Sequence, residues 1–398
     1  MSSFRLDGSG WSRRLSGEPQ ETITFNAETR EVIRASDGAV IGSDIFEVLT
    51  ELTRADPTAT WIGYLGYACR PDLPARPASG VPDAVWMRVP AHVGDAGYAG
   101  ALPLGKSPSP LRGIASRKDP HTPRLMSSIP DSYTEAFGEV QRRLRAGDSY
   151  EVNLTRRVDL GIDIESDPDE VYAELCAINP APYAAHLWHD GTYILSASPE
   201  CFVTIADGHV RTKPIKGTTS RGADEAADRA SAERLETDPR FRAENLMITD
   251  LMRNDLSQVC SPGTVKVSQL MQVESYASVH QLVSTVEGTL RPETGVIAAV
   301  RALFPAGSMT GAPKRRTMEI IDAVEGTPRG IYSGVLGWIR GDACELSVVI
   351  RTLVRDPGGH WSAGTGGGVT VHTDAASEWT ESEWKVDRLR SALERSRR

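Results

Sequence analysis

A chain of 398 residues can bury a large core without disulfides, as one large domain or as two to three ordinary ones. Its net charge of -9 argues against nucleic acid or an anionic membrane as the main partner, because both need a positively charged protein surface. The five cysteines are odd in number and lack C-x-x-C spacing, which favours a reducing, cytoplasmic location without a zinc site. No apolar run reaches about 18 residues, so we expect neither a membrane span nor an export signal.

The N-terminal quarter predicts short elements and loops. Ser43 or Asp44 can cap a helix that runs to Leu52. Trp61 to Tyr67 alternates large residues with glycines, which predicts a strand at which backbones approach closely. Pro71 to Pro82 and Pro103 to Pro123 are rich in proline, serine and glycine, and we expect loops there.

The middle of the chain mixes helices with strands. Asp131 to Gly147 has the apolar spacing of an amphipathic helix, and Tyr150 to Leu160 predicts the strand that follows it. Val171 to Ala177 predicts another helix. Three further strands are predicted at Tyr183 to Leu187, Tyr193 to Ser196 and Cys201 to Ile205. The order lacks a steady βαβ rhythm, which favours an α+β fold over a doubly wound sheet.

Lys216 is the residue around which a reactive site can be argued. Pro214 restricts the backbone before it, and Gly217 permits close approach of a ligand after it. We therefore expect Lys216 on a stiff, exposed turn, where its amine could act as a nucleophile. A solvated loop lysine explains the same residues.

Glu200 is a candidate acid for that amine. The Asp-Gly pair at 207–208 is a strong hairpin signal, and the two strands that it joins would fold back to bring Glu200 near Lys216. A carboxyl group beside a lysine suits nucleophilic attack with protonation of a leaving hydroxyl. A plain surface ion pair is the alternative.

Carboxylates on two predicted helices could bind a divalent cation. Glu244 lies early in a largely apolar helix over Phe241 to Asp255, where its burial would need a compensating charge. Glu378, Glu381 and Lys385 share one face of a C-terminal helix. Mg²⁺ takes a few carboxylates and substrate oxygens, so these positions suit it. A solvated helix face with an i, i+4 ion pair is the alternative.

Two glycine-rich segments could bind anionic oxygens through backbone amides. They are Phe304 to Lys314 and Ser362 to Thr370, and the second follows an alternating strand predicted over Leu346 to Leu353 that carries Arg351. Neither segment is a P-loop, so a nucleotide site is not indicated.

Eight ordered motifs resemble the chorismate-utilising enzyme family. They are Ser198-Pro-Glu200, Pro214 to Thr218, Ala243 to Ile248 with Arg253 to Asp255, His280 to Ser284, Phe304 to Lys314, Arg329 to Gly334, Ile350 to Thr352 and Glu378 to Lys385. The resemblance runs from about Tyr133 to Leu393. It implies an α+β fold with an antiparallel β-sandwich core flanked by helices. We expect a single chorismate-binding domain over residues 1–398, with a divergent N-terminal portion at 1–125 and the catalytic motifs at 126–398.

Within the family, Lys216 is similar to the lysine of the branch that aminates chorismate at C4, whereas anthranilate synthases typically carry alanine there. The resemblance implies that the Lys216 amine attacks C2, the 4-hydroxyl leaves, and ammonia adds at C4 and expels the lysine. The product, 4-amino-4-deoxychorismate, is the precursor of para-aminobenzoate, as in folate biosynthesis.

The resemblance also assigns roles to the other motif residues. Glu200 is implied as general acid or base, and His280 is expected to face the substrate ring. The implied Mg²⁺ ligands are Glu244 and Glu381, with Glu378 close behind. The implied substrate-binding residues are Gly217, Thr218, Thr310, Tyr332, Arg351, Gly366, Gly367, Gly368 and Lys385.

Three positions depart from the family pattern. Glu151 stands where amine-adding members often have glutamine and water-adding members have a lysine base, so we expect neither an isochorismate nor a salicylate synthase. Phe241 replaces a glutamate common three residues before the metal-binding one. Thr365 resembles part of a small insertion in the glycine segment.

The resemblance implies a separate glutamine amidotransferase that supplies ammonia, because no cysteine of this chain sits in a Gly-x-Cys-x-Gly context. Use of free ammonia is the alternative. Two other functions stay open: an anthranilate-synthase-like lyase, and a non-catalytic homologue that only binds chorismate or a partner.

Overall fold

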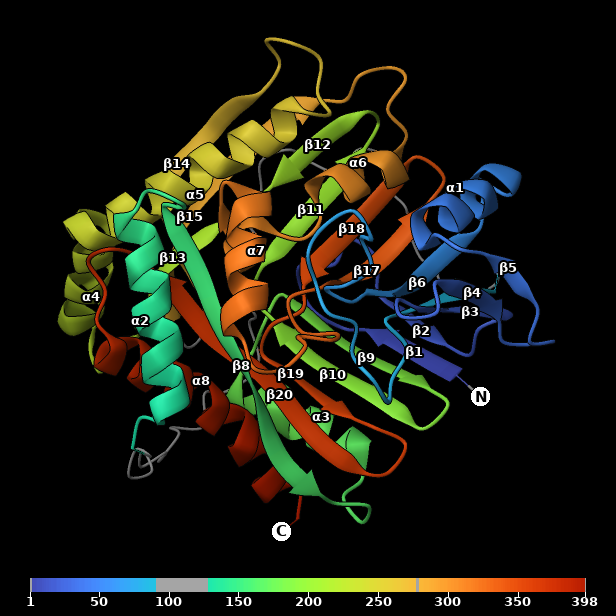
Figure 1. Ribbon diagram of the computed structural model, residues 1–398, viewed down its shortest axis with the longest axis horizontal. Helices are drawn as coiled ribbons and strands as arrows, with labels where there is room; N and C mark the ends of the chain where they lie inside the picture. Colours follow the sequence, from blue (N-terminus) through green and yellow to red (C-terminus); the bar gives the residue numbers. More distant parts are fainter. Residues whose placement is uncertain (1, 91–127, 277–278, 398) are drawn as a thin grey trace.

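The protein is an α+β structure built on two antiparallel sheets, seen in a computed structural model that describes residues 2–90, 128–276 and 279–397 (Figure 1). The smaller sheet has eight strands in the described chain, in the spatial order β16 (Gly311–Ala312), β8 (Glu151–Ile162), β20 (His360–Val369), β19 (Thr352–Arg355), β10 (Thr192–Ser198), β9 (Tyr183–His189), β1 (Ser2–Leu6) and β2 (Leu15–Gly17). The larger sheet runs in the order β13 (Ile215–Ser220), β15 (Val279–Thr289), β12 (His209–Thr212), β11 (Cys201–Ala206), β18 (Ala343–Val348), β17 (Val335–Arg340), β6 (Thr60–Leu65), β7 (Ala84–Val89), β3 (Glu21–Asn26), β4 (Glu31–Arg34) and β5 (Val40–Gly42), with β14 (Lys266–Ser275) also paired to β15.

The two sheets pack face to face. Phe4, Leu187 and Ile194 from the smaller sheet form one buried cluster with Ile62 and Leu336 from the larger sheet. Interdigitated side chains from two inner faces are the defining feature of a β-sandwich. The predicted fold class is confirmed.

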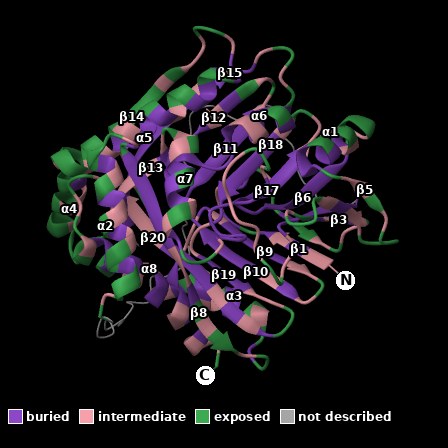
Figure 2. Cartoon of the chain, in the orientation of Figure 1, coloured by how far each residue is buried: buried purple, intermediate pink, exposed green. Residues whose placement is uncertain are grey.

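Helices cover the outer faces of this sandwich. They are α1 (Ile45–Ala55), α2 (Asp131–Arg145), α3 (Pro168–Ile178), α4 (Glu225–Thr237), α5 (Pro239–Ser257), α6 (Val296–Leu303), α7 (Lys314–Val324) and α8 (Ala375–Arg395), with a short 3₁₀ turn, η1, at Gly307–Met309. Val171 of α3 and Leu389 of α8 pack on Trp361 of the smaller sheet. Figure 2 shows that the strands are mostly buried, whereas α4 is largely exposed.

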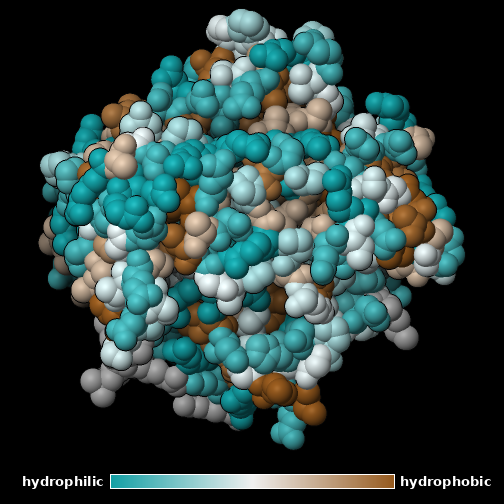
Figure 3. Space-filling model, in the orientation of Figure 1, coloured by the Kyte–Doolittle hydropathy of each residue, from teal (hydrophilic) through white to brown (hydrophobic). Residues whose placement is uncertain are grey.

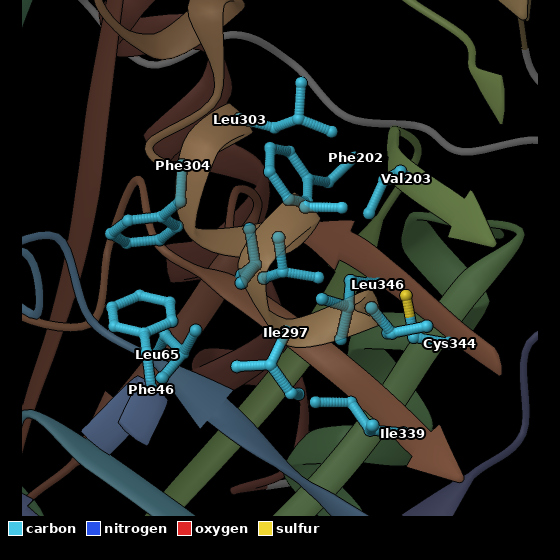
Figure 4. Close-up of a cluster of buried hydrophobic side chains, with 14 of the residues drawn as sticks. Phe46, Leu65, Phe202, Val203, Ile297, Leu303, Phe304, Ile339, Cys344 and Leu346 are labelled. Carbon is cyan, nitrogen blue, oxygen red and sulfur yellow. The ribbon is translucent and has the colours of Figure 1, made fainter. Parts of the chain in front are cut away.

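The larger sheet is covered by α1 and α6. Phe46 of α1 and Phe304, which follows α6, face each other with ring centroids 6.1 Å apart (Figure 4). Ile297, Ile339 and Leu346 extend the same buried cluster. Each such buried side chain contributes about 1.5–3 kcal/mol of hydrophobic free energy, so this layer holds the helices on the sheet.

Predictions of helix caps and turns that rest on neighbouring residues are confirmed. Asp44 caps α1 by accepting hydrogen bonds from the amides of Phe46 and Glu47. Gly147 adopts a left-handed φ of +80° just after α2, as expected of a glycine that ends a helix. Asp207 and Gly208 are also left-handed and connect β11 to the antiparallel β12, so the hairpin prediction is confirmed.

Lys216 does not lie on an exposed turn. It belongs to β13, which pairs with β15, and only 13% of its side chain is exposed. The predicted flexibility at Gly217 is present as a bulge with φ +89°, where an ideal Cβ would lie 2.9 Å from Leu235. Pairing with a strand more than 60 residues further along the chain buries the lysine, and local sequence carries no sign of that partner.

The strand predicted over Leu346 to Leu353 is two strands in different sheets. β18 ends at Val348 in the larger sheet, and β19 begins at Thr352 in the smaller one. Arg351 occupies the crossing with a left-handed φ of +50°. A non-glycine residue tolerates that backbone only where its surroundings enforce it, and such residues concentrate at functional sites.

The glycine-rich segment at 362–370 is mostly a strand rather than a loop. Gly366, Gly367 and Gly368 pair in register with Thr155, Leu154 and Asn153 of β8. Thr365 is in regular register, and the irregularity of this strand lies between Trp361 and Ser362. The glycines therefore lie in a paired strand and leave the face of the sheet free of side chains, instead of forming a loop with unpaired amides.

Two further expectations concern segments between elements. Pro71 to Pro82 contains neither helix nor strand, as predicted, whereas the loop predicted at Pro103 to Pro123 lies outside the described residues. The molecular face in Figure 3 is mostly hydrophilic, with scattered hydrophobic residues. Within the described ranges, no helix combines the length and the apolar character needed to cross a membrane.

Candidate active site

A cavity of about 720 Å³ is lined by residues of both sheets and of α5 and α8. Most of the residues singled out from the sequence line it, although they come from distant parts of the chain. They are Glu200, Lys216, Gly217, Thr218, Glu244, Tyr332, Arg351, Gly366, Gly367, Gly368, Glu378, Glu381 and Lys385. The cavity is large enough for a small dicarboxylic acid and mixes apolar walls with charged groups, as ligand sites do.

Glu200 is the last residue of the turn between β10 and β11 and is 8% exposed. The Ser308 hydroxyl donates a hydrogen bond to its Oε1 at 2.7 Å. Burial raises the pKa of Glu200 to about 7, although Ser308, Lys216 and Arg351 act in the opposite direction. Both the acid and the carboxylate are therefore populated near neutral pH, which suits a group that gives and takes protons.

Lys216 faces the cavity and is paired on its other side. Its Nζ donates to the carboxylate of Glu151, the first residue of β8. Burial alone would lower the pKa of Lys216, but attraction to Glu151 outweighs it and raises the pKa above its ordinary value. The resting amine is thus a protonated cation.

Arg351 and Tyr332 form another wall. Burial, assisted by repulsion from Arg388, lowers the pKa of Arg351 to about 10. In the described structure its guanidinium has neither a hydrogen-bond nor an ion-pair partner. A buried cation without a partner is costly, and an anionic ligand would remove that cost. The Tyr332 ring packs over Gly364, where an ideal Cβ would lie 2.0 Å from it.

Carboxylates from α5 and α8 meet at the cavity. Arg240 donates to Glu244 at 3.1 Å and lies 3.7 Å from Glu378. Burial and the neighbouring Glu381 raise the pKa of Glu378 to about 7. Lys385 pairs with Glu381 at 2.9 Å, which lowers the pKa of Glu381, and also donates to the Gly366 carbonyl at 2.8 Å.

This donor set fits Mg²⁺ in its chemistry. A divalent cation would relieve the repulsion and burial that raise the pKa of Glu378. Within the described residues no group of three or more His, Cys, Asp or Glu side chains is arranged to hold a metal. The fit is that of an ion held by one or two carboxylates together with substrate oxygens, which is the usual way proteins bind Mg²⁺.

His280 and Thr310 do not line this cavity. His280 is 2% exposed, and its ring nitrogens contact Ser275 at 2.8 Å and Asp228 at 3.0 Å. The Thr310 hydroxyl donates to the Ala306 carbonyl at 3.2 Å. Thr310 therefore bonds the backbone of its own segment, whereas His280 bonds two side chains that are not part of the cavity lining.

Sequence reasoning missed three residues of the site. Ser308 lies in the glycine-rich segment that was considered only for its amides, and Asn153 follows Glu151 on β8; both line the cavity. Arg240 was overlooked although its i, i+4 spacing to Glu244 is a readable signal. The contact between Lys216 and Glu151 had no such signal, because the two residues are 65 positions apart.

Comparison with known proteins matches this arrangement to one family. A family model described as chorismate binding enzyme matches residues 4–391. Aminodeoxychorismate synthase of Streptomyces pristinaespiralis is 40% identical over 366 residues, covering 84% of this chain and 50% of that protein. Aminodeoxychorismate synthase component 1 of Salmonella typhimurium is 35% identical over 411 residues, covering 96% of this chain and 89% of that protein.

Relatives with another name also match. Anthranilate synthase component 1 1 of Halobacterium salinarum is 42% identical over 272 residues, covering 67% of this chain and 51% of that protein. The crystal structure of anthranilate synthase component I from Streptococcus pneumoniae superposes with a TM-score of 0.74 at 24% identity, covering 98% of this chain and 92% of that one. This chain spans half or less of the length of the first two curated relatives.

Proposed function

Because the chain belongs to the chorismate binding enzyme family, we propose that it aminates chorismate at C4 to 4-amino-4-deoxychorismate. The observation that carries this proposal is the presence of Lys216 in one cavity with Glu200 and Arg351. A lysine amine at this place offers a covalent route that an inert side chain does not. Relatives named aminodeoxychorismate synthase support the same conclusion.

Chorismate carries two carboxylates, and Arg351 is the cation placed to receive one of them. Lys385 is already engaged by Glu381 and by the Gly366 carbonyl. Gly366, Gly367 and Gly368 leave the space into which the substrate fits, since they lie in the wall of the cavity without side chains. We restrict direct substrate contact to the lining residues, so His280 and Thr310 are not included.

The reaction then has two covalent stages. The neutral Lys216 amine forms a bond to C2, the ring double bond shifts, and the 4-hydroxyl leaves as water with a proton from Glu200. Ammonia next adds at C4, the double bond returns, and the bond from C2 to Lys216 breaks. Glu200 regains a proton from the ammonium formed on the product. A pKa of about 7 lets Glu200 serve in both directions.

One or two of the carboxylates of Glu244, Glu378 and Glu381, together with substrate oxygens, would hold Mg²⁺, which when bound neutralises charge on a substrate carboxylate. Arg240 lies between two of these carboxylates and shields them from each other. The carboxylates and Arg351 together orient the ring, so that C2 faces the Lys216 amine.

We further propose that ammonia comes from a separate glutamine amidotransferase, in line with the component naming of the Salmonella relative. Residues 1–398 would form a single chorismate-binding domain. The N-terminal strands support this, because β1 and β2 extend the smaller sheet and β3 to β7 extend the larger one.

An anthranilate-synthase-like lyase is the second candidate, and the relatives of that name favour it. Such a reaction adds nitrogen to the ring and then eliminates pyruvate. It has no use for a nucleophilic lysine, so Lys216 favours amination without elimination. A non-catalytic homologue is the third candidate, but it would not need Glu200 and Lys216 together.

Incubation with chorismate, Mg²⁺ and ammonium tests the proposal, with wild type beside Lys216→Ala and Lys213→Ala. Lys213 is a matched control because it lies just before the same strand and pairs with Glu274 at 2.6 Å. We expect 4-amino-4-deoxychorismate from wild type and from the control, and none from Lys216→Ala. Formation of anthranilate and pyruvate by wild type would move the lyase to first place. Chorismate binding without turnover would favour the non-catalytic homologue.

A further inference from the structure

Glu151 lies directly behind the Lys216 amine. Glu151 is 4% exposed and its carboxylate contacts Lys216 Nζ, but Glu151 is not part of the cavity lining to which Lys216 belongs. In the described chain Lys216 is the only hydrogen-bonding or ion-pairing partner of this carboxylate. Glu151 therefore reaches the reacting centre through the amine alone.

The pair occupies a space that the fold leaves open for it. Glu151 pairs with Ala312 of β16, and the next residue of β8, Val152, pairs with Val369 of β20, so antiparallel pairing holds the start of this strand. At Gly368 an ideal Cβ would lie 2.0 Å from Glu151 Oε1 and 2.9 Å from Lys216 Nζ. Any larger residue at position 368 would push the carboxylate and the amine apart.

A protonated lysine has no lone pair and cannot attack carbon, so the reaction needs a base for this proton. The carboxylates that act on Lys216 are Glu151 of β8, Glu200 before β11, Glu244 of α5 and Glu381 of α8. Glu200 has to carry a proton to the leaving hydroxyl, and Glu244 and Glu381 are engaged by Arg240 and Lys385. Of these four carboxylates, Glu151 alone is in contact with Nζ, and no other described group engages it.

We propose that Glu151 is the proton acceptor that activates Lys216, an inference that rests on the proposed amination. Entry of chorismate brings C2 to the cavity side of Nζ. One proton passes from Nζ to the Glu151 carboxylate, leaving a neutral carboxylic acid and a neutral amine, and the amine lone pair then forms the bond to C2. After ammonia has displaced the amine from C2, Glu151 returns its proton to Nζ and both groups are restored.

This assignment depends on the carboxylate of Glu151. The glutamine that amine-adding members of the family often have at this position could hold the lysine by a hydrogen bond but could not take its proton. The carboxylate makes Glu151 chemically competent for a step that glutamine cannot perform.

Two measurements on Glu151→Gln test the proposal. The first is reductive methylation of Lys216 by formaldehyde and a hydride donor at about pH 8.5, read by peptide mass spectrometry without chorismate. Loss of the Glu151 charge lowers the pKa of Lys216, so methylation should speed up about tenfold or more, since each pKa unit changes the free amine tenfold. The second is turnover of chorismate with ammonium near pH 7, where a lysine with an ordinary pKa is still protonated and glutamine cannot take its proton, so kcat should fall about 100-fold while KM changes little.

Glu151→Asp and Glu274→Gln complete the design. Glu151→Asp keeps a carboxylate, so it should retain more activity than Glu151→Gln and guards against a folding defect. Glu274→Gln removes the matched partner of Lys213 and should leave Lys216 methylation and turnover unchanged. Near wild-type turnover of Glu151→Gln, or an unchanged methylation rate, overturns the proposal. A wild-type chain that makes no 4-amino-4-deoxychorismate overturns the proposed function instead, while methylation still decides whether Glu151 sets the charge of Lys216.

Discussion

Ser308 donates a hydrogen bond to Glu200 at 2.7 Å across 108 positions of sequence. The bond joins the η1 turn to the start of β11 and favours the carboxylate form of Glu200, thereby lowering a pKa that burial raises to about 7. A proton donor with such a pKa loses activity as pH rises through it. The pH at which kcat falls on the alkaline side therefore reports on the contact between Ser308 and Glu200.

Ser308→Ala should move the alkaline limb of kcat to higher pH. The hydroxyl of Ser308 opposes the rise in the pKa of Glu200 that burial causes. Without it the pKa rises further, so the acid form of Glu200 persists to higher pH. The measurement is the pH profile of kcat for chorismate amination. Ser257→Ala, which alters an exposed serine on α5, is the control and should not shift the profile. A limb that stays in place or moves to lower pH contradicts the role of Glu200 as acid.

Gly368→Ala should impair the site more than the fold. The added Cβ meets Glu151 Oε1 at 2.0 Å, and the Lys216 contact is lost with it. We expect at least a tenfold loss of kcat/KM and about 1–3 kcal/mol of destabilisation in urea.

Gly138→Ala on α2 is the matched glycine control, because an added Cβ meets nothing within 4 Å. It should stabilise by about 0.5–1 kcal/mol through helix propensity and leave turnover alone. Equal activities of the two alanine variants would contradict the steric argument.

Mg²⁺ should stabilise the free protein, which tests the metal site apart from catalysis. At about 100 times its dissociation constant the ion adds about 2.7 kcal/mol to the free energy of unfolding. Glu378→Gln should abolish most of that gain, whereas Arg240→Gln should tighten Mg²⁺ binding because it removes a cation that competes for Glu244 and Glu378. Urea unfolding with and without Mg²⁺ measures both effects. Equal stabilisation of wild type and Glu378→Gln would remove Glu378 from the site.

Glu325→Gln should lower the free energy of unfolding by about 3–5 kcal/mol, the usual cost of breaking a buried ion pair. Both carboxylate oxygens of Glu325 accept from Arg329, at 2.6 and 2.9 Å, and one also accepts from the Thr155 amide at 2.8 Å. Arg329 is 3% exposed, so its charge would remain buried without compensation.

Glu225→Gln is the control for that change, because Glu225 pairs with Arg229 at the same i, i+4 spacing on an exposed face of α4. It should alter stability by less than about 0.5 kcal/mol. A similar small effect from Glu325→Gln would contradict the assignment of the buried pair.

Much of the site was readable before the fold, because motif residues keep their chemistry wherever the chain places them. Glu200, Arg351 and Glu378 were selected from the sequence and line the cavity. The predicted secondary structure was wrong where pairing with distant strands determines the backbone conformation. Arg351 was expected inside a strand, yet it lies where the chain changes sheets.

Sequence by itself determined the features that depend on near neighbours. Asp44 caps α1 because its side chain reaches amides two and three residues on, and Asp207 with Gly208 turns the chain because both accept a left-handed backbone. Tertiary structure alone decided the burial and the charge of Lys216. Those properties come from β15, which pairs with the strand of Lys216, and from Glu151, which lies 65 positions away in sequence but contacts the amine. Desolvation and Coulomb attraction depend on distance in space, and no local pattern of residues records that distance.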